Sequence, residues 1–209
     1  MGALSIMGVE ERKEIFQPLL PDCNSIEFNN EKDILKITSK TAGVVLETIQ
    51  GGAGFIVPKN NYLKKIKNRC SAVGSLLILD EIQPGFGRTG KLFGFEHYDI
   101  SPDILAIGKG MGGGMPIGAF TASKELMSLL SNHPKLGHIT TFGGHPVIAS
   151  AALATLKEIT RTNLIEETLQ KETIFRKHLV HPLIKEIRGK GLMLALIVDT
   201  PEIASEVIL

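Results

Sequence analysis

The sequence has few cysteines, no long apolar run and almost no net charge. Its 209 residues include 2 cysteines, and its 23 basic side chains nearly balance its 22 acidic ones, which leaves a net charge of +1. Cys23 and Cys70 do not form a metal-binding spacing, and two cysteines without a signal peptide indicate a cytoplasmic protein. The small net charge predicts no general attraction to nucleic acid or to membranes. No apolar run approaches the roughly 20 residues that a membrane helix needs.

Two short apolar runs, Leu76–Leu79 and Ile104–Ile107, stand out in the middle of the chain. Each run is continuously apolar, which is typical of a strand buried on both faces of a parallel sheet. The first run ends at Asp80, and the second is followed by Lys109 between two glycines. Because ligands bind at the carboxyl ends of the strands in an open α/β sheet, Asp80 and Lys109 are predicted to lie at the same edge.

Further patterns along the chain predict two more strands and several helices. A β-branched run predicts a strand over 44–49, and apolar residues at 3–4 spacing predict a helix over 61–73 that Gly74 ends. Such a strand–helix–strand unit is normally a right-handed crossover between parallel strands. The other expected elements are a short helix over 30–40, a helix capped by Ser123, helices over 146–159 and 163–179, a strand over 192–198 and a helix from Pro201.

The residue types of Asp80 and Lys109 suggest a chemistry. Flanking glycines let Lys109 approach a ligand with little backbone obstruction, and a partly desolvated lysine is a nucleophile toward carbonyl groups. A Schiff-base lysine with an acid on the pyridinium nitrogen is the protein's signature for pyridoxal phosphate. The spacing alone equally allows Lys109 to be a solvated loop lysine and Asp80 to cap a turn.

Two nucleotide-binding patterns overlap the same stretch, and we reject both. Residues 108–113 match G-x-G-x-x-G, but Pro116 and a β-rich run follow them instead of the helix that a dinucleotide site needs. Residues 85–91 match the start of a P-loop, but Leu92 stands where the magnesium-binding hydroxyl belongs. His178 and His181 lie three residues apart without an evident third ligand, so no metal site is predicted.

Three longer blocks resemble the class III aminotransferases. They are LLILDEIQPGFGRTGKLFGFEHY, PDILAIGKGMGGGMPIGAF and TTFGGHP, and weaker resemblance covers nearly the whole chain. The family includes the acetylornithine, ornithine and 4-aminobutyrate aminotransferases, which are pyridoxal-phosphate enzymes of fold type I. The resemblance implies an α/β fold with a mostly parallel central sheet flanked by helices. Residues 1–160 would be part of the large cofactor-binding domain, and residues 161–209 a linking helix and the start of a smaller C-terminal domain.

The resemblance also implies roles for single residues. Lys109 is expected to form a Schiff base with pyridoxal 5′-phosphate, Asp80 to pair with the pyridine nitrogen, and Gln83 to lie near the ring oxygen. Thr140 and Thr141 offer hydroxyls beside a helix N-terminus, which suits a phosphate group. Thr141 matches the family residue that contacts the phosphate of the cofactor bound mainly by the partner subunit, so a homodimer is expected.

The activity implied by the resemblance moves an amino group from an amino acid or ω-amino donor to a 2-oxo acid, with 2-oxoglutarate as the expected acceptor. The alternatives are a pyridoxal-phosphate-dependent aminomutase of the same fold and an inactive, truncated α/β domain. The chain is expected to be truncated at both ends, without the family's main phosphate loop, ring-stacking aromatic residue and substrate-carboxylate arginine. Thr48 and Gly52 stand where the family usually has proline and glutamate. We therefore expect weak cofactor binding and little activity from these 209 residues alone.

Overall fold

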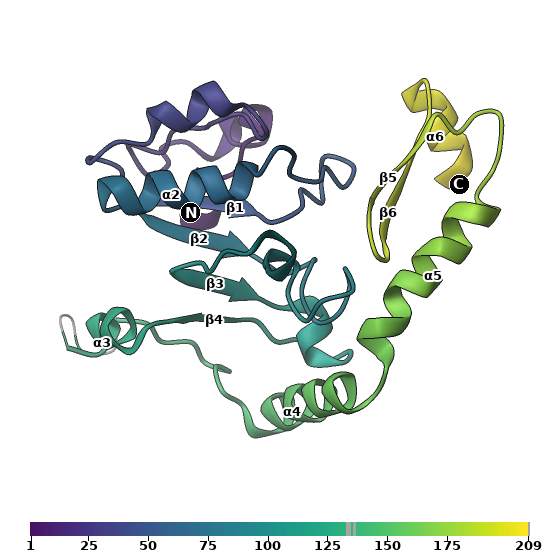
Figure 1. The fold of residues 1–209 in the computed structure, drawn as a ribbon. Helices are drawn as coiled ribbons and strands as arrows, with labels where there is room; N and C mark the ends of the chain where they lie inside the picture. The colour runs from purple at the N-terminus through teal and green to yellow at the C-terminus, as the bar shows by residue number, and fades with distance from the viewer. Residues whose placement is uncertain (133–134, 136, 209) are drawn as a thin grey trace.

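The structure is a computed structural model that describes residues 1–132, 135 and 137–208 (Figure 1). Its centre is a sheet of four strands, β1 (Gly43–Glu47), β2 (Leu76–Asp80), β3 (Ile104–Ile107) and β4 (Ala119–Ala122). The strands are arranged in the order β1-β2-β3-β4. β1, β2 and β3 run parallel, and β4 is antiparallel to β3. The predicted mostly parallel sheet is confirmed.

The predicted strands differ from the observed ones only at their ends. Both continuously apolar runs form strands, and β2 extends one residue further, to Asp80. β1 ends at Glu47, two residues before the predicted end at Ile49. Thr48 and Ile49 are nevertheless fully buried. The β-branched residues of this run therefore stay buried for two residues beyond the end of β1.

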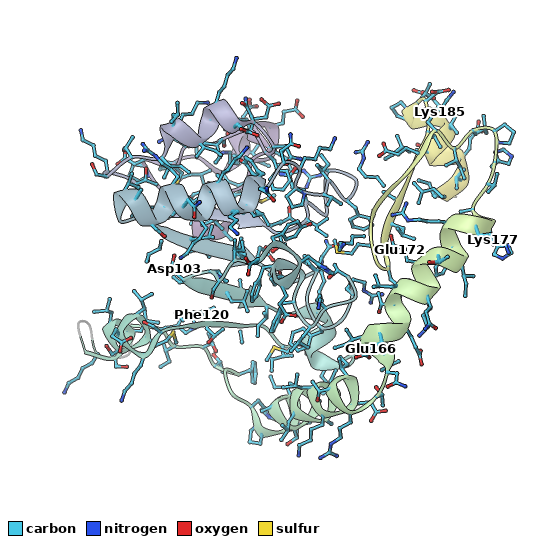
Figure 2. All side chains as sticks on the ribbon, in the orientation of Figure 1. Asp103, Phe120, Glu166, Glu172, Lys177 and Lys185 are labelled. Carbon is cyan, nitrogen blue, oxygen red and sulfur yellow. The ribbon has the colours of Figure 1, made fainter. Side chains whose placement is uncertain are left out.

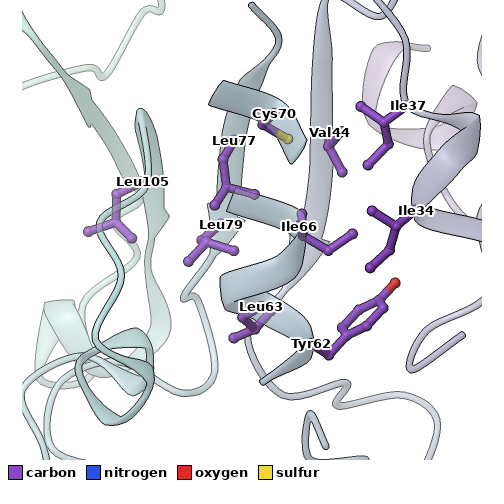
Figure 3. Close-up of a cluster of buried hydrophobic side chains, with 10 residues drawn as sticks. All are labelled: Ile34, Ile37, Val44, Tyr62, Leu63, Ile66, Cys70, Leu77, Leu79 and Leu105. Atoms are coloured by element: carbon purple, nitrogen blue, oxygen red, sulfur yellow. The ribbon is translucent and has the colours of Figure 1, made fainter. Parts of the chain in front are cut away.

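Helix α2 (Tyr62–Val73) connects β1 to β2 and packs on the sheet (Figure 3). Leu63, Ile66 and Cys70 have no exposed surface, which confirms the apolar helix face predicted from their spacing. Gly74 has a φ of +79°, and its N–H bonds to the Cys70 carbonyl, so the helix ends in the left-handed conformation that glycine adopts most easily. The buried cluster consists of Ile34, Ile37, Val44, Tyr62, Leu63, Ile66, Cys70, Leu77, Leu79 and Leu105.

Short helices fill the N-terminal segment and the loops that follow the strands. The helix predicted over 30–40 is a 3-10 helix, η3 (Glu31–Lys36), and the Asn30 side chain caps it by accepting a bond from the Lys32 N–H. The other short helices are α1 (Gly2–Ser5), η1 (Glu10–Arg12), η2 (Glu14–Phe16), η4 (Gly94–Tyr98) and η5 (Lys109–Gly112).

The chain leaves the sheet after β4 and forms three helices, a hairpin and a last helix (Figure 1). Ser123 accepts a bond of 3.3 Å from the Leu126 N–H, which confirms the predicted N-cap of the first helix in this part. The elements are α3 (Lys124–Asn132), α4 (Pro146–Arg161), α5 (Leu164–His178), β5 (Glu186–Lys190), β6 (Met193–Ile197) and α6 (Pro201–Ile208). The predicted domain boundary at residues 160–161 falls in the last turn of α4 and stays a prediction. Among the described residues, no helix is both long and apolar enough to span a membrane.

The hairpin of β5 and β6 is fastened to α5 by an arginine and a glutamate. Arg176 donates from Nη1 to the Ile187 carbonyl at 2.6 Å and from Nη2 to the Gly189 carbonyl at 3.0 Å. Glu172 accepts a bond of 2.7 Å from the Gly191 N–H, and it lies on the side of α5 that faces the hairpin (Figure 2). These three bonds hold the turn of the hairpin against the helix.

We predict that Leu79→Ala lowers the free energy of unfolding by about 3 kcal/mol, because the side chain of Leu79, in β2, is fully buried in the cluster that includes the apolar face of α2. Urea unfolding followed by circular dichroism measures this loss. Leu35→Ala is the matched control, since Leu35 is 70% exposed and should change stability very little. Equal losses in the two variants would contradict the proposed position of the core.

Candidate active site

Asp80 and Lys109 follow neighbouring strands at the carboxyl edge of the sheet. Asp80 is the last residue of β2 and pairs with Glu47 of β1 and with Ala106 of β3. Lys109 opens η5, two residues after β3 ends at Ile107. The strand order therefore brings both residues to the edge where the sequence predicted them, while their chemical roles stay predictions.

The Asp80 side chain is half-buried, and one of its two carboxylate oxygens accepts a hydrogen bond from the loop that follows β2. Its Oδ1 accepts a bond of 2.9 Å from the Ile82 N–H, which closes a tight turn after β2. The interpretation of Asp80 as a turn cap is thus correct for one of its two oxygens. Within the described residues, the second oxygen has no hydrogen bond or ion pair, so it is available to a cationic or N–H group of a ligand.

Lys109 is held in an unusual backbone conformation. Its φ is +44°, in the left-handed region that is costly for a residue with a side chain. Such strain amounts to about 1–3 kcal/mol per residue and is concentrated at functional sites. The side chain is exposed, and in the part of the chain that the structure describes its amine forms no ion pair or hydrogen bond. The backbone thus holds a free amine at the end of β3.

Gln83 lies at the same edge, over the loop that follows β1. A Cβ atom on Gly51 would lie 2.7 Å from Gln83 Nε2, closer than real contacts allow. The absence of a side chain at Gly51 therefore makes room for the Gln83 amide. Glu47 accepts a bond of 3.0 Å from the Gly51 N–H, so the loop that supports Gln83 is itself held by the end of β1.

Thr140 and Thr141 form no hydrogen bond with Asp80, Gln83 or Lys109 in the part of the chain that the structure describes. Both are exposed and lie in the turn before α4, where His145 Nδ1 accepts a bond from the Val147 N–H and caps the helix. α4 approaches η5 near its middle, at Thr155. Because a helix rises 1.5 Å per residue, Thr155 lies roughly 13 Å along the helix axis from Pro146, where α4 begins. Their expected role in the partner's site stays a prediction.

Glu81 is a buried residue of this edge whose position the sequence analysis did not predict. Its carboxylate accepts bonds from the Thr48 hydroxyl, from the Gly94 N–H at 2.7 Å and from the Phe95 N–H at 2.8 Å. Burial raises the pKa of Glu81, and these hydrogen bonds oppose that rise. The available signal was the two-residue repeat of a strand, because this repeat, continued past Asp80, places Glu81 on the same face as Leu77 and Leu79, which the structure shows to be fully buried.

A family model described as "Aminotransferase class-III" matches residues 1–208. The chain belongs to the class III aminotransferase family. It is 40% identical over 200 residues to the [LysW]-aminoadipate semialdehyde/glutamate semialdehyde transaminase of Sulfolobus acidocaldarius, covering 93% of this chain and 51% of that protein. It is 43% identical over 210 residues to the putrescine aminotransferase of Pectobacterium atrosepticum, covering 94% and 45%. The chain spans about half the length of the curated relatives it matches.

Solved structures agree with the fold of this class III aminotransferase chain. An ornithine aminotransferase of Toxoplasma gondii, described with partial occupancy of pyridoxal phosphate at its active site, has a TM-score of 0.86 and 34% sequence identity. That match covers 95% of this chain and 48% of the other. An acetylornithine aminotransferase of Elizabethkingia anophelis has a TM-score of 0.77 and 36% identity, over 85% and 46%. The predicted fold type I architecture is confirmed.

An apolar cavity of about 390 Å³ lies beside the site of this aminotransferase chain, between α4 and the segment around η5. Its lining includes Phe86, Phe93, Ile107, Met111 and Leu153. Among the described residues that line it, none is charged or titratable, so these residues offer no partner for a phosphate or a pyridinium nitrogen. The polar groups at the strand ends, rather than this cavity, form the candidate site.

The glycine-rich loop after β2 contacts both the hairpin and the half-buried His97 of η4. The Leu192 N–H donates to the Arg88 carbonyl at 2.9 Å, which joins the hairpin turn to the loop. His97 Nε2 lies 3.0 Å from the Thr89 carbonyl, so His97 supports the backbone of this loop. Burial lowers the pKa of His97, and the nearby charge of Lys190 lowers it further.

We predict that part of the acid sensitivity of this aminotransferase chain comes from His97. Its folded-state pKa lies below the unfolded value of 6.5, so the unfolded chain binds more protons as the pH falls through that range. The stabilising contribution of neutral His97 is therefore present above about pH 6.5 and lost as the pH falls. His97→Gln removes this titration, and its amide N–H can still donate to Thr89.

Urea unfolding at about pH 7.5 and about pH 5.5 measures the effect on either side of the histidine range. The loss of stability on acidification should be smaller in His97→Gln than in the wild type. His178→Gln, at an exposed position at the end of α5, is the control and should keep the wild-type loss. An unchanged loss in His97→Gln would show that His97 does not titrate in the way its surroundings imply.

Proposed function

We propose that the protein transfers an amino group from an amine donor to a 2-oxo acid, with pyridoxal 5′-phosphate held between Lys109 and Asp80. The observation that carries this proposal is the strained Lys109, whose free amine lies at the same sheet edge as the half-buried Asp80. Membership of the class III aminotransferase family supports amino-group transfer. The pyridoxal phosphate in the similar T. gondii ornithine aminotransferase supports the cofactor.

The residues at this edge fit the chemical groups of pyridoxal phosphate. Asp80 has one carboxylate oxygen without a partner among the described residues, and a carboxylate suits a protonated ring nitrogen. Lys109 provides a primary amine, which suits an aldehyde. Gln83 provides an amide that can donate to a ring oxygen. When bound, pyridoxal phosphate supplies an aldehyde that condenses with amines and a ring that accepts electrons from the reacting carbon.

Each residue then has a separate task in the proposed reaction. Lys109 would hold the cofactor through Nζ, and its amine, when free, would move the α-proton of the donor as general base and general acid. Its left-handed backbone fixes the origin of the side chain at the end of β3. Asp80 keeps a proton on the ring nitrogen through the oxygen that does not bond to Ile82. Gln83 orients the ring by donating to its oxygen.

We propose an ω-amino donor as the substrate class, with 2-oxoglutarate as the acceptor. The names of the relatives support this donor class, because putrescine and ornithine both carry a terminal primary amine. We further propose a homodimer in which Thr140 and Thr141 serve the phosphate of the partner's site. Their exposure in the turn before α4 supports such a role between subunits. A cytoplasmic location is proposed from the two free cysteines, Cys23 and Cys70.

We predict that Lys109 is the residue that borohydride links covalently to pyridoxal phosphate. The purified chain is incubated with the cofactor and reduced with borohydride, and peptide mapping by mass spectrometry locates the label. Lys109→Ala should lose the label at this peptide, because the substitution removes the amine at the end of β3. Lys59→Ala removes an exposed lysine from the loop before α2 and should leave the Lys109 label unchanged.

Two outcomes would count against the assignment. Labelling of the wild type spread over many surface lysines, without enrichment at Lys109, would remove the evidence for a built site. A label that persists elsewhere at full yield in Lys109→Ala would place the reactive amine on another residue. In the longer parent protein, Lys109→Ala should also abolish amino-group transfer.

A further inference from the structure

Glu81 directly follows Asp80, yet the two carboxylates face opposite sides of the sheet. Along β2 and just beyond it, Leu77, Leu79 and Glu81 are fully buried, whereas Ile78 and Asp80 are half-buried. This alternation is the one expected when successive side chains of a strand point in opposite directions. A rotation of the backbone that moved the Glu81 carboxylate would therefore also turn the Asp80 carboxylate.

Three hydrogen bonds from two other segments fix the Glu81 side chain. The Thr48 hydroxyl donates to Oε1 from the position just after β1. The Phe95 N–H donates to the same oxygen at 2.8 Å, and the Gly94 N–H donates to Oε2 at 2.7 Å. Hydrogen bonds to a buried carboxylate are stronger than neutral ones, so this side chain resists rotation more than its neighbours.

The main chain around Glu81 is held from both sides as well. The Glu81 N–H donates to the Ala106 carbonyl of β3 at 2.9 Å, and the Gly85 N–H donates to the Glu81 carbonyl at 3.0 Å. On the other side, the Thr48 N–H donates to the Asp80 carbonyl at 3.4 Å. The position of Glu81 thus joins the ends of β1, β2 and β3 to the loop that reaches η4.

We propose that Glu81 is a positioning residue that fixes the direction of the Asp80 carboxylate, with Thr48 as its supporting donor. This inference rests on the proposed role of Asp80 toward pyridoxal phosphate. Glu81 itself faces the protein interior and acts only through the backbone that it shares with Asp80. Loss of the hydrogen bonds of Glu81 should therefore weaken cofactor binding when residue 80 is aspartate, and should have no effect when residue 80 is asparagine.

Two substitutions weaken this anchor to different degrees. In Glu81→Gln, the amide NH₂ must face one of the donors that the carboxylate accepted, so one backbone N–H, of Gly94 or Phe95, loses its partner. Thr48→Val keeps the shape of the side chain and removes only its hydroxyl. Thr168→Val is the matched control, because Thr168 is also a buried threonine, and its hydroxyl donates to the Gly87 carbonyl at 3.0 Å, away from Glu81.

The test is a double-mutant cycle on the full 209-residue chain. Glu81→Gln, Thr48→Val and Thr168→Val are each made with Asp80 and with Asp80→Asn. The readout is the concentration of pyridoxal phosphate that half-saturates borohydride labelling of the Lys109 peptide. Circular dichroism shows which variants are folded, and if Glu81→Gln is not, Thr48→Val carries the cycle alone. A cycle separates a change that acts through Asp80 from one that acts independently of it.

With Asp80 present, we expect the half-saturating concentration to rise about tenfold in Glu81→Gln, which leaves a backbone N–H without its acceptor, and about threefold in Thr48→Val, which removes a hydroxyl and leaves every backbone N–H paired. With Asp80→Asn, both increases should disappear, and Thr168→Val should have no effect in either background. Equal increases in both backgrounds would overturn the positioning role and leave the proposed function intact. An Asp80→Asn chain that binds like the wild type, or a wild type without saturable labelling, would overturn the role of Asp80 and this inference together.

Discussion

The parallel pairing of β2 with both of its neighbours is the constraint on which the candidate site depends. Because β1, β2 and β3 run in the same direction, their carboxyl ends meet at one edge, and residues far apart in sequence become neighbours there. The buried face of β2 fixes its register, since a shift by one residue would turn Leu77 and Leu79 outward and move Asp80 to the opposite face. The packing of α2 against the sheet thus determines the direction of a functional side chain.

The edge combines rigid support with local strain. Glu81, with its three hydrogen bonds, gives Asp80 a fixed base, while Lys109 adopts a left-handed backbone whose cost only the surrounding structure can offset. A general base must be flexible enough to move a proton and must start from a fixed point. The exposed Lys109 side chain, on its fixed backbone, suits both needs. The anchored Asp80 places a carboxylate of fixed direction at the same edge of the sheet.

The sequence was sufficient to predict the elements whose pattern is local. The apolar runs of β2 and β3 and the apolar face of α2 marked their own positions, and the parallel direction of β1 and β2 followed from the crossover. β5 (Glu186–Lys190) could not be predicted, because its polar residues are a strand only through pairing with β6 and the bonds from Arg176. The anchoring of Glu81 was hidden for a similar reason, since Thr48 lies 33 residues away. The left-handed φ of Lys109 could not be predicted either, because the glycines on both sides indicate a flexible backbone without indicating its conformation.

A crystal structure of the chain soaked with pyridoxal phosphate tests the central claim most directly, because that claim assigns Asp80 and Lys109 to one cofactor site. The account predicts continuous electron density from Lys109 Nζ to the cofactor, with an Asp80 oxygen within hydrogen-bonding distance of the ring nitrogen. It also predicts that Glu81 keeps its bonds to Thr48, Gly94 and Phe95. Cofactor density attached to another lysine, or a ring nitrogen that faces away from Asp80, would contradict it.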